Sequence, residues 1–410
     1  MKAFLKLCPV LVLAGMLLSG VDILLAAPTA TVLAGILAFT LERHSYKDIY
    51  HSAIENAKNL IDILFILMIS FALAEVFMAS GVGASIIIVA VKIGLTGKTV
   101  ASAALLVTAI LSVATGTSWG TFAACAPVFL WLSHIIGGSP LLTISAIAGG
   151  CCFGDNIGLI SDTTVLSSGV HQVEVTDRVR HQGAWSITCL LVAAVVFFLV
   201  SVSTGLSSTA GNANAAIDSI PAEVWTALEE KRASAVTLLQ QVRDGVPLYM
   251  LLPLIAVVVT AVMGVGTVIC LGLGIFLALV FGMMAGTLTL SGFGDLVYAG
   301  FSDAGSWSVS MTLWTAAFGG IMASMNAFDP LVKGVLKIAH NVRQLMTCNA
   351  ILSLLCNAVL GDCTGQIVTM GPIIKNMTET AVEATPEQMY KLRLRNSTFS
   401  DAFGTIGYQL

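Results

Sequence analysis

Two short polar strings interrupt strongly apolar sequence, and they hold the residues best suited to bind a cation. The first string, ATGTSWGT, occupies residues 114–121 and places two glycines and four hydroxyls between apolar runs. Glycine lets a helix unwind, and unwound carbonyls together with Thr or Ser hydroxyls are hard oxygen ligands that suit Na⁺. The expected contributors are Thr115, Thr117 and Ser118. Close helix packing through small residues is the alternative explanation of this string.

The second string, GDNIGLISDTT, occupies residues 154–164 and holds two carboxylates, Asp155 and Asp162. On a continuous helix their spacing puts both on one face, and Gly158 permits a break that brings them closer. Carboxylates inside a membrane are costly and are functional by default. One carboxylate can hold Na⁺ when ionised and a proton when neutral, so competition between the two cations is the simplest basis for exchange. Capping of a helix end is the alternative role of each Asp.

Both strings recur in the second half of the chain, which indicates a tandem duplication. Residues 116–120 match residues 361–365 at an offset of 245, and the Pro that follows keeps the same spacing. Residues 153–158 match residues 399–404 at an offset of 246. Internal repeats with interrupted apolar segments are the best pointer in a sequence to the binding site of a secondary transporter.

In this register Asp401 is the counterpart of Asp155, and Asp362 is the counterpart of Thr117. A midplane site on the axis between the two copies would draw ligands from both. We therefore expect Asp155 and Asp401 to be the main ligands of Na⁺ or a proton, assisted by Asp162, Asp362 and oxygens of the first string. A local cap or an interhelical hydrogen bond is the alternative for Asp362 and Asp401.

Five further residues are candidates to line a substrate cavity. Asn156, Trp119, Ser161 and Thr163 belong to the two polar strings, and Trp119 has simple packing as its alternative. Glu75 lies within an apolar helix that runs from about residue 65 to residue 77. A buried proton carrier and a partner in an interhelical hydrogen bond are both open for this carboxyl.

The composition requires a polytopic helical membrane protein. The chain is 57% hydrophobic and only 10% charged, with a mean hydropathy of +0.92. Several apolar stretches approach the ~20 residues that span a bilayer as a helix. No basic cluster suggests a nucleic-acid partner, and the nine cysteines lack metal-ligand spacing. No Walker A string is present, and no G-x-S-x-G string with triad partners, so an ATP-driven pump or a hydrolase has no support and no enzyme is expected.

The fold class we predict is an all-α polytopic membrane protein with two inverted-topology repeats. Residues 6–20 are expected to be a retained first helix. The first repeat spans 4–170, an additional transmembrane helix spans 184–203, and the second repeat spans 247–410. Residues 204–246 are expected to be a polar and amphipathic loop outside the membrane.

The Lys and Arg pattern predicts that the two repeats are inverted, because cytoplasmic loops collect positive charge. Segment 42–59 is basic and its counterpart 288–305 has no Lys or Arg, whereas 131–150 has none and its counterpart 376–396 is basic. Lys2 and Lys6, and later Arg178 and Arg180, place the N-terminus and the end of the first repeat on the cytoplasmic side of the inner membrane. Residues 99–130 and 346–375 must then enter and return, so we expect broken or re-entrant helices there.

The two strings, together with the tail DRVRH at residues 177–181, resemble the NhaC-type sodium/proton antiporters of the ion transporter superfamily. The resemblance covers most of the chain and implies an inverted-repeat fold, an inner-membrane location and Na⁺-coupled exchange without a cofactor. The family pattern has a Lys after the Gly-Asp pair and a Ser-Pro two residues later. Here Asn156 replaces the Lys, and Gly158 and Leu159 replace the Ser-Pro. Relatives with this general motif include exchangers of organic acids and amino acids.

The first hypothesis is therefore a secondary active Na⁺/H⁺ antiporter that works by alternating access in the lipid bilayer. The second is Na⁺- or H⁺-coupled transport of a small organic solute, an amino acid or a carboxylate. Asn156 and Trp119 are then candidate contacts of that solute. A channel or a non-transporting receptor forms a third class. A channel conducts without coupling, whereas the repeat-related carboxylates favour coupled transport. A homodimer is left open.

Overall fold

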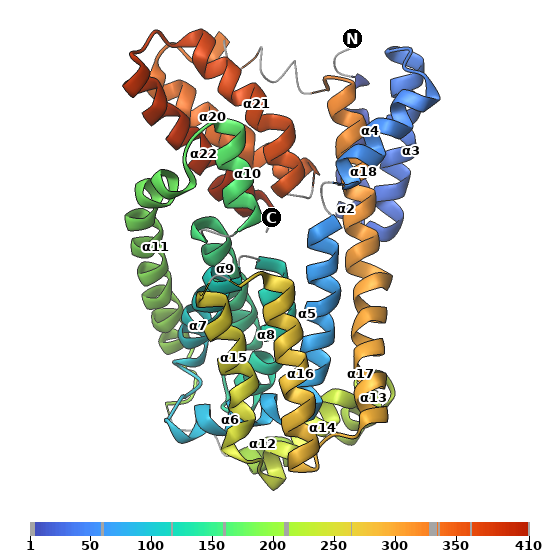
Figure 1. The fold of residues 1–410 in the computed structure, drawn as a ribbon, viewed down its shortest axis with the longest axis vertical. Helices are drawn as coiled ribbons and strands as arrows, with labels where there is room; N and C mark the ends of the chain where they lie inside the picture. Colours follow the sequence, from blue (N-terminus) through green and yellow to red (C-terminus); the bar gives the residue numbers. More distant parts are fainter. Residues whose placement is uncertain are drawn as a thin grey trace. The chain divides into compact units, whose positions relative to one another are not determined.

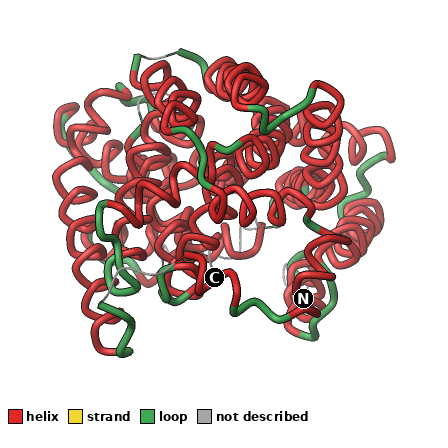
Figure 2. Tube along the Cα trace, turned by 90° about the horizontal axis from the view of Figure 1, so that it is seen from below, coloured by secondary structure: helices red, strands yellow, loops and turns green. Residues whose placement is uncertain are grey.

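The computed structural model is helical throughout the part of the chain that it describes, with short connecting turns (Figures 1 and 2). It describes the 410 residues except 1–4, 59–60, 116–117, 159–160, 209–212, 264, 328–333, 335–336, 361–362 and 409–410. The helices of the first half are α2 (Cys8–Leu18), α3 (Ile23–Leu41), α4 (Tyr46–Lys58), α5 (Ile61–Ser80), α6 (Val82–Lys92), α7 (Val100–Thr115), α8 (Ser118–Ile135), α9 (Pro140–Ile157), α10 (Asp162–His171) and α11 (Val175–Ser203). The second half holds α12 (Ala213–Asp218), α13 (Ala222–Lys231), α14 (Ala233–Asp244), η1 (Leu248–Leu251), α15 (Leu252–Val262), α16 (Thr267–Ala285), α17 (Leu290–Asp303), η2 (Ala304–Val309), α18 (Ser310–Ser324), α20 (Val342–Leu360), α21 (Cys363–Ala381) and α22 (Pro386–Tyr408).

The helix bounds recur at the offset found in the sequence. Helices α7, α8 and α9 correspond to α20, α21 and α22, and α2 to α5 correspond to α15 to α18, within a few residues at each end. Pro127 inside α8 and Pro372 inside α21 occupy equivalent positions. The opposite orientation of the two copies in a membrane stays a prediction.

Local chemistry explains why α9 and α22 begin at equivalent residues. Each starts with a Pro, whose missing N–H and fixed φ suit the first position of a helix. The hydroxyl of Ser139 accepts a hydrogen bond from the Leu142 amide at 3.4 Å, and that of Thr385 accepts one from the Gln388 amide at 3.4 Å. Both side chains therefore cap the first turn of their helix.

The chain forms two compact units that cross the expected repeat boundaries. Unit 1 comprises Met1–Leu64, Asp162–Gln182 and Ser306–Leu410, and unit 2 comprises Phe65–Ser161 and Gly183–Gly305. Unit 1 thus combines the first helices of the first copy with the last helices of the second copy. Unit 2 contains the complementary set.

Glycines bring the helices of different copies together within each unit. In unit 1, α18 packs on α3 and α4, and a Cβ at Gly320 would collide with the backbone carbonyl of Ser52. In unit 2, a Cβ at Gly300 of α17 would collide with the backbone of Ala72 in α5. These equivalent contacts join early helices of the two copies, because α17 is the counterpart of α4 and α18 is the counterpart of α5.

The closest helix pair of unit 2 is α7 with α9, which lie side by side in Figure 1. A Cβ at Gly150 would collide with the Thr108 hydroxyl and the Leu105 carbonyl, so only glycine permits this distance. The Ser112 hydroxyl donates to the Cys151 carbonyl at 2.5 Å across the same contact. Small side chains therefore set the distance between α7 and α9.

A further break lies between α5 and α6, which the sequence analysis did not anticipate. The two helices are bent by 66° at Gly81, whose φ of 105° lies in the left-handed region. Its counterpart at the offset of 245, Asn326, has a φ of 49° and follows the end of α18. Asn tolerates this conformation better than most residues.

Three described helices, α3, α11 and α16, are long and apolar enough to cross a membrane, and the bent pair of α5 and α6 adds a fourth when counted as one span. Helix α11 begins at Val175 rather than near residue 184, so it includes Arg178. Most of its later large apolar side chains, such as Trp185 and Leu199, are exposed, as expected for contact with lipid.

Residues 204–246, expected to be a polar loop, contain three helices that pack on the rest of unit 2. Helix α14 lies against α6, and α12 lies against α8 and α14. The buried face of α14 consists of Ser234, Ala235, Leu238, Leu239 and Val242. Arg232, between α13 and α14, donates to Glu75 of α5 at 3.1 Å and to Asp303 of α17 at 2.6 Å.

We predict that Gly150→Ala lowers the melting temperature of the purified protein, because the new methyl group forces α7 and α9 apart at a cost of about 1–3 kcal/mol. Gly149→Ala is the matched control, since its Cβ would meet only Leu105 Cδ1 at 3.4 Å. Thermal unfolding in detergent measures both. Equal melting temperatures for the two variants would contradict the close packing.

We predict that Glu75→Gln and Arg232→Gln are coupled in a double-mutant cycle. Arg232 is about half exposed, at 55%, whereas the Glu75 side chain is only 15% exposed. Solvent screening therefore limits the expected coupling to about 0.5–1 kcal/mol. Melting temperatures of the two single variants and the double variant test this. Additive losses would show that the ion pair contributes nothing.

Candidate functional site

The carboxylate of Asp155 lies at the meeting of two helix interruptions in unit 2. It belongs to the last turn of α9 and is 8% exposed. Its Oδ2 accepts a hydrogen bond from the Ser118 hydroxyl at 2.7 Å, and its Oδ1 accepts one from the Ser161 hydroxyl at 2.6 Å. One residue from each polar string thus contacts the same carboxylate.

The local backbone explains this arrangement. Helix α7 ends at Thr115 and α8 begins at Ser118, and the two residues between them lie outside the described residues. Helix α9 ends at Ile157, and Gly158 adopts an extended conformation with φ −67° and ψ 126°. A Cβ at Gly154 would collide with the backbone amide of Val113 and with Ser112, so this glycine lets the end of α9 approach α7. Ser161 then turns toward Asp155.

The donor set around Asp155 suits a small hard cation. Each Ser hydroxyl donates its hydrogen to the carboxylate and keeps oxygen lone pairs. A carboxylate and two hydroxyls are oxygen ligands of the kind that Na⁺ takes. Burial in a membrane protein makes an isolated charge expensive, so the site favours either a bound cation or a proton on the carboxyl.

Several expected ligands are placed only in part. Thr117 and Asp362 lie outside the described residues. Thr115 is the last residue of α7 and Asp162 the first residue of α10, and their side chains also lie outside the described part. The break between Asp155 and Asp162 that the intervening glycine predicts is present.

The substrate-cavity candidates of unit 2 do not all converge on Asp155. Asn156 is 8% exposed, and its amide donates to the Cys152 carbonyl at 2.9 Å, one turn earlier in α9. Trp119 follows Ser118 in the first turn of α8 and is half-buried. Glu75 forms an ion pair with Arg232, which resembles the predicted interhelical hydrogen bond more than a free proton carrier. Thr163 belongs to unit 1, where it is buried in the first turn of α10.

The second expected ligand, Asp401, has a different environment in unit 1. Its Oδ2 lies 2.5 Å from Nη2 of Arg178, and neither side chain is exposed to solvent. The Thr164 hydroxyl donates to the same carboxylate oxygen at 3.5 Å. Asp401 is therefore the acceptor of a fully buried ion pair.

Buried polar side chains continue around this ion pair. His171 Nε2 lies 3.0 Å from the Ser400 hydroxyl, and the Ser397 hydroxyl donates to Ser167 at 3.3 Å. Sequence reasoning missed Arg178 because it read the tail after α10 as a cytoplasmic loop. Arg178 and Asp401 are 223 residues apart, so no local spacing in the sequence indicates their pairing.

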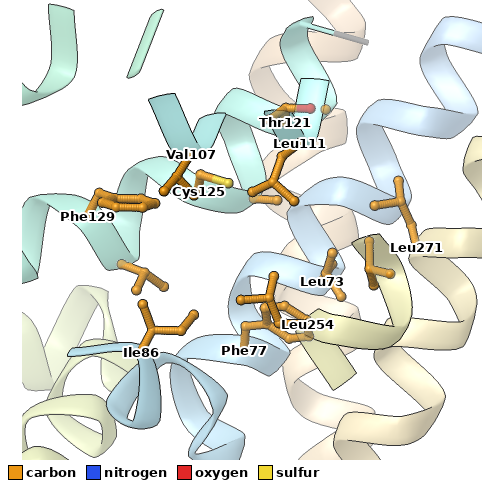
Figure 3. Close-up of a pocket in the computed structure, with 14 residues that line it drawn as sticks. Leu73, Phe77, Ile86, Val107, Leu111, Thr121, Cys125, Phe129, Leu254 and Leu271 are labelled. Atoms are coloured by element: carbon orange, nitrogen blue, oxygen red, sulfur yellow. The ribbon is translucent and has the colours of Figure 1, made fainter. Parts of the chain in front are cut away.

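An apolar cavity of about 70 Å³ lies beside α8 in unit 2 (Figure 3). Leu73, Phe77 and Ile86 line it on one side, and Leu111, Cys125 and Phe129 line it on another. Thr121 contributes a hydroxyl to an otherwise apolar wall. With one hydroxyl among apolar side chains, the cavity offers fewer oxygen ligands to a cation than the surroundings of Asp155 do.

Three known antiporters are similar to this chain. The malate-2H⁺/Na⁺-lactate antiporter of Bacillus subtilis (strain 168) is 31% identical over 162 residues, which are 40% of this chain and 34% of that protein. The Na⁺/H⁺ antiporter NhaC of Alkalihalophilus pseudofirmus is 22% identical over 322 residues, 78% of this chain and 68% of that protein. The arginine/ornithine antiporter ArcD of Halobacterium salinarum is 24% identical over 293 residues, 67% of this chain and 57% of that protein.

The matched regions thus span between about a third and two thirds of these relatives. A sequence profile of the Na⁺/H⁺ antiporter family matches the chain twice, over residues 4–157 and over residues 150–403. Together the two matches cover nearly the whole chain. The predicted resemblance is confirmed: this chain belongs to the Na⁺/H⁺ antiporter family.

Proposed function

We propose that this protein exchanges Na⁺ for H⁺ and that the Asp155 carboxylate is the group for which the two cations compete. The observation that carries the proposal is the buried carboxylate that accepts hydrogen bonds from Ser118 and Ser161 at two helix interruptions. Family membership supports the two transported ions. The proposal includes an inner-membrane location with a cytoplasmic N-terminus, and alternating access to a site at the membrane midplane.

The exchange follows from the two states of one carboxyl. In the ionised state, Asp155 and the two hydroxyl oxygens coordinate Na⁺. In the protonated state the carboxyl is neutral, so no buried charge opposes the change in access of the site when Na⁺ is absent. Because only one cation occupies the carboxylate at a time, movement of Na⁺ in one direction returns a proton in the other.

Asp401 plays a different part in this proposal. Its pairing with Arg178 already supplies a positive charge, so a Na⁺ ion there would face the guanidinium. We therefore propose Na⁺ at Asp155 and not at Asp401. Transport of an organic solute is the second candidate function, favoured by relatives named for lactate, malate, arginine and ornithine.

We predict that Asp155→Asn abolishes Na⁺-induced proton movement in proteoliposomes that hold the purified full chain. The amide cannot ionise or carry a proton, so the loss should exceed about 100-fold, as expected for removal of a group that carries the transported ions. A pH-sensitive dye inside the vesicles measures the movement after Na⁺ is added outside. Asp48→Asn is the control, because Asp48 lies in an exposed helix turn and accepts a hydrogen bond from Ser45. Full activity of Asp155→Asn would remove this carboxylate from the transport path.

We predict that Ser118→Ala and Ser161→Ala each raise the half-saturating Na⁺ concentration by about 10-fold, with smaller effects on the maximal rate. Each variant removes one oxygen ligand and one hydrogen bond to a charged group, which is worth about 1.5–3 kcal/mol. The same dye assay over a range of Na⁺ concentrations measures the shift. Ser145→Ala is the matched control on α9, since the exposed Ser145 hydroxyl donates only to the Leu141 carbonyl. An unchanged Na⁺ dependence in both site variants would refute a role for the hydroxyls.

A further inference from the structure

The buried guanidinium of Arg178 offers more hydrogen-bond donors than unit 1 satisfies. Arginine has five N–H donors in a planar fork. Nη2 donates to Asp401 at 2.5 Å, whereas Nε and Nη1 have no hydrogen-bond partner among the residues that the structure describes. The Arg178 side chain is 0% exposed. Buried donors without a partner are unfavourable, and more so when the group is charged, so an acceptor that reaches these donors would stabilise the site.

The surroundings of Arg178 and Asp401 are polar although they are buried. The side chains of Thr164, Ser167, His171, Ser397 and Ser400 are all fully buried on α10 and α22. Gln366 of α21 is also 0% exposed, and both polar atoms of its amide lack a hydrogen-bond partner among the described residues. Helix α21 packs on both α10 and α22. The interior of unit 1 is therefore built to hold polar groups.

We infer that Arg178 binds the carboxylate of a small organic solute and that Asp401 carries the proton that crosses with it. The inference rests on the proposed function only in that the protein is an ion-coupled antiporter, and it names a substrate class for that transport.

The geometry of the ion pair suggests this assignment. A guanidinium binds a carboxylate best through two parallel N–H···O bonds, and Asp401 engages one nitrogen of Arg178. The carboxylate of a solute is chemically the same acceptor as the Asp401 side chain. The solute and Asp401 therefore compete for one guanidinium, and the solute can use the donors that Asp401 leaves.

Charge balance couples this competition to a proton. A monocarboxylate such as lactate brings one negative charge, and Asp401 gives up its contact with Arg178. A carboxylate left buried without its cation is costly, so Asp401 takes up one proton from the aqueous phase and becomes neutral. The ion pair of Arg178 with Asp401 is replaced by an ion pair of Arg178 with the solute. The net charge of the site is unchanged, and one proton accompanies each carboxylate.

Other titratable and charged groups face this region from the elements packed around it. They are His171 on α10, Cys363 and Lys375 on α21, and Arg393 on α22. The side chain of Asp162 and all of Asp362 lie outside the described residues. Replacing Asp401 alone therefore separates its proton from any that these groups exchange.

The first test uses the purified full chain with L-lactate and L-malate as probes. Thermal stabilisation by each probe is measured between pH 6 and pH 8, with lactamide as the neutral analogue and chloride as a simple anion. The half-saturating carboxylate concentration of the unaltered protein should fall as the pH falls, by up to tenfold per pH unit for one linked proton. In Asp401→Asn the binding should remain but lose its pH dependence, because Arg178 is then always available. Absence of any pH dependence in the unaltered protein, or its persistence in Asp401→Asn, would overturn the inference.

A second variant guards against misfolding. Arg178→Gln leaves the Asp401 charge alone in the interior and is expected to destabilise unit 1. The double variant Arg178→Gln with Asp401→Asn removes both charges and should fold. It should lose carboxylate binding by at least tenfold, whereas Arg178→Lys should retain a weakened response. Carboxylate binding at the unaltered affinity in the double variant would overturn the inference.

Na⁺-induced proton movement in the same vesicles separates this inference from the proposed function. Intact Na⁺/H⁺ exchange without any response to lactate or malate would overturn the role of Arg178 and leave Asp155 as proposed. A pH-linked carboxylate response that is lost in the double variant, with no Na⁺-induced movement, would support Arg178 and overturn the proposed function.

Discussion

A carboxylate inside a membrane protein must find its partners within the protein, because no water is at hand to solvate it. The two copies of the duplicated sequence place an Asp at equivalent positions, and the structure satisfies each in its own way. Asp155 accepts two Ser hydroxyls, whereas Asp401 is paired with a buried arginine. The Asp155 carboxylate has neutral hydroxyl partners, so its negative charge can be balanced by a bound cation. The charge of Asp401 is already balanced by Arg178. The duplication thus supplies two sites of unlike chemistry from one ancestral pattern.

The helix breaks and the glycines around these carboxylates help to bring polar partners to them. A helix interior offers no backbone groups to a ligand, so the chain must be interrupted where a site is built. Helices α7 and α8, and α9 and α10, are interrupted beside Asp155, and Gly154 lets the end of α9 lie against α7. Gly300 lets α17 approach α5 and Gly320 lets α18 approach α4, so early helices of the two copies pack together. Small residues therefore act both as packing surfaces and as the means of placing polar groups.

Much of this organisation was accessible from the sequence. Composition predicted the membrane class, the two polar strings predicted the family, and Gly158 predicted the break after Asp155. The bend at Gly81 was missed because a single glycine in an apolar run has many explanations. The left-handed φ of Gly81, and that of Asn326 at the equivalent position of the second copy, identify a turn in both copies. The amphipathic character predicted within residues 204–246 corresponds to α13 and α14, and the position of this segment outside the membrane stays a prediction.

The sequence by itself determined that this chain is a duplicated, helical member of an antiporter family, since periodicity, composition and repeated motifs are properties of the chain alone. Only the tertiary structure decided which side chains meet. Ser118, Asp155 and Ser161 come together because two helix ends and a turn converge, and no local rule states that distance. Arg178 and Asp401 are 223 residues apart and meet within unit 1. Which distant side chains meet depends on how whole helix faces pack, and a local sequence pattern does not specify that packing.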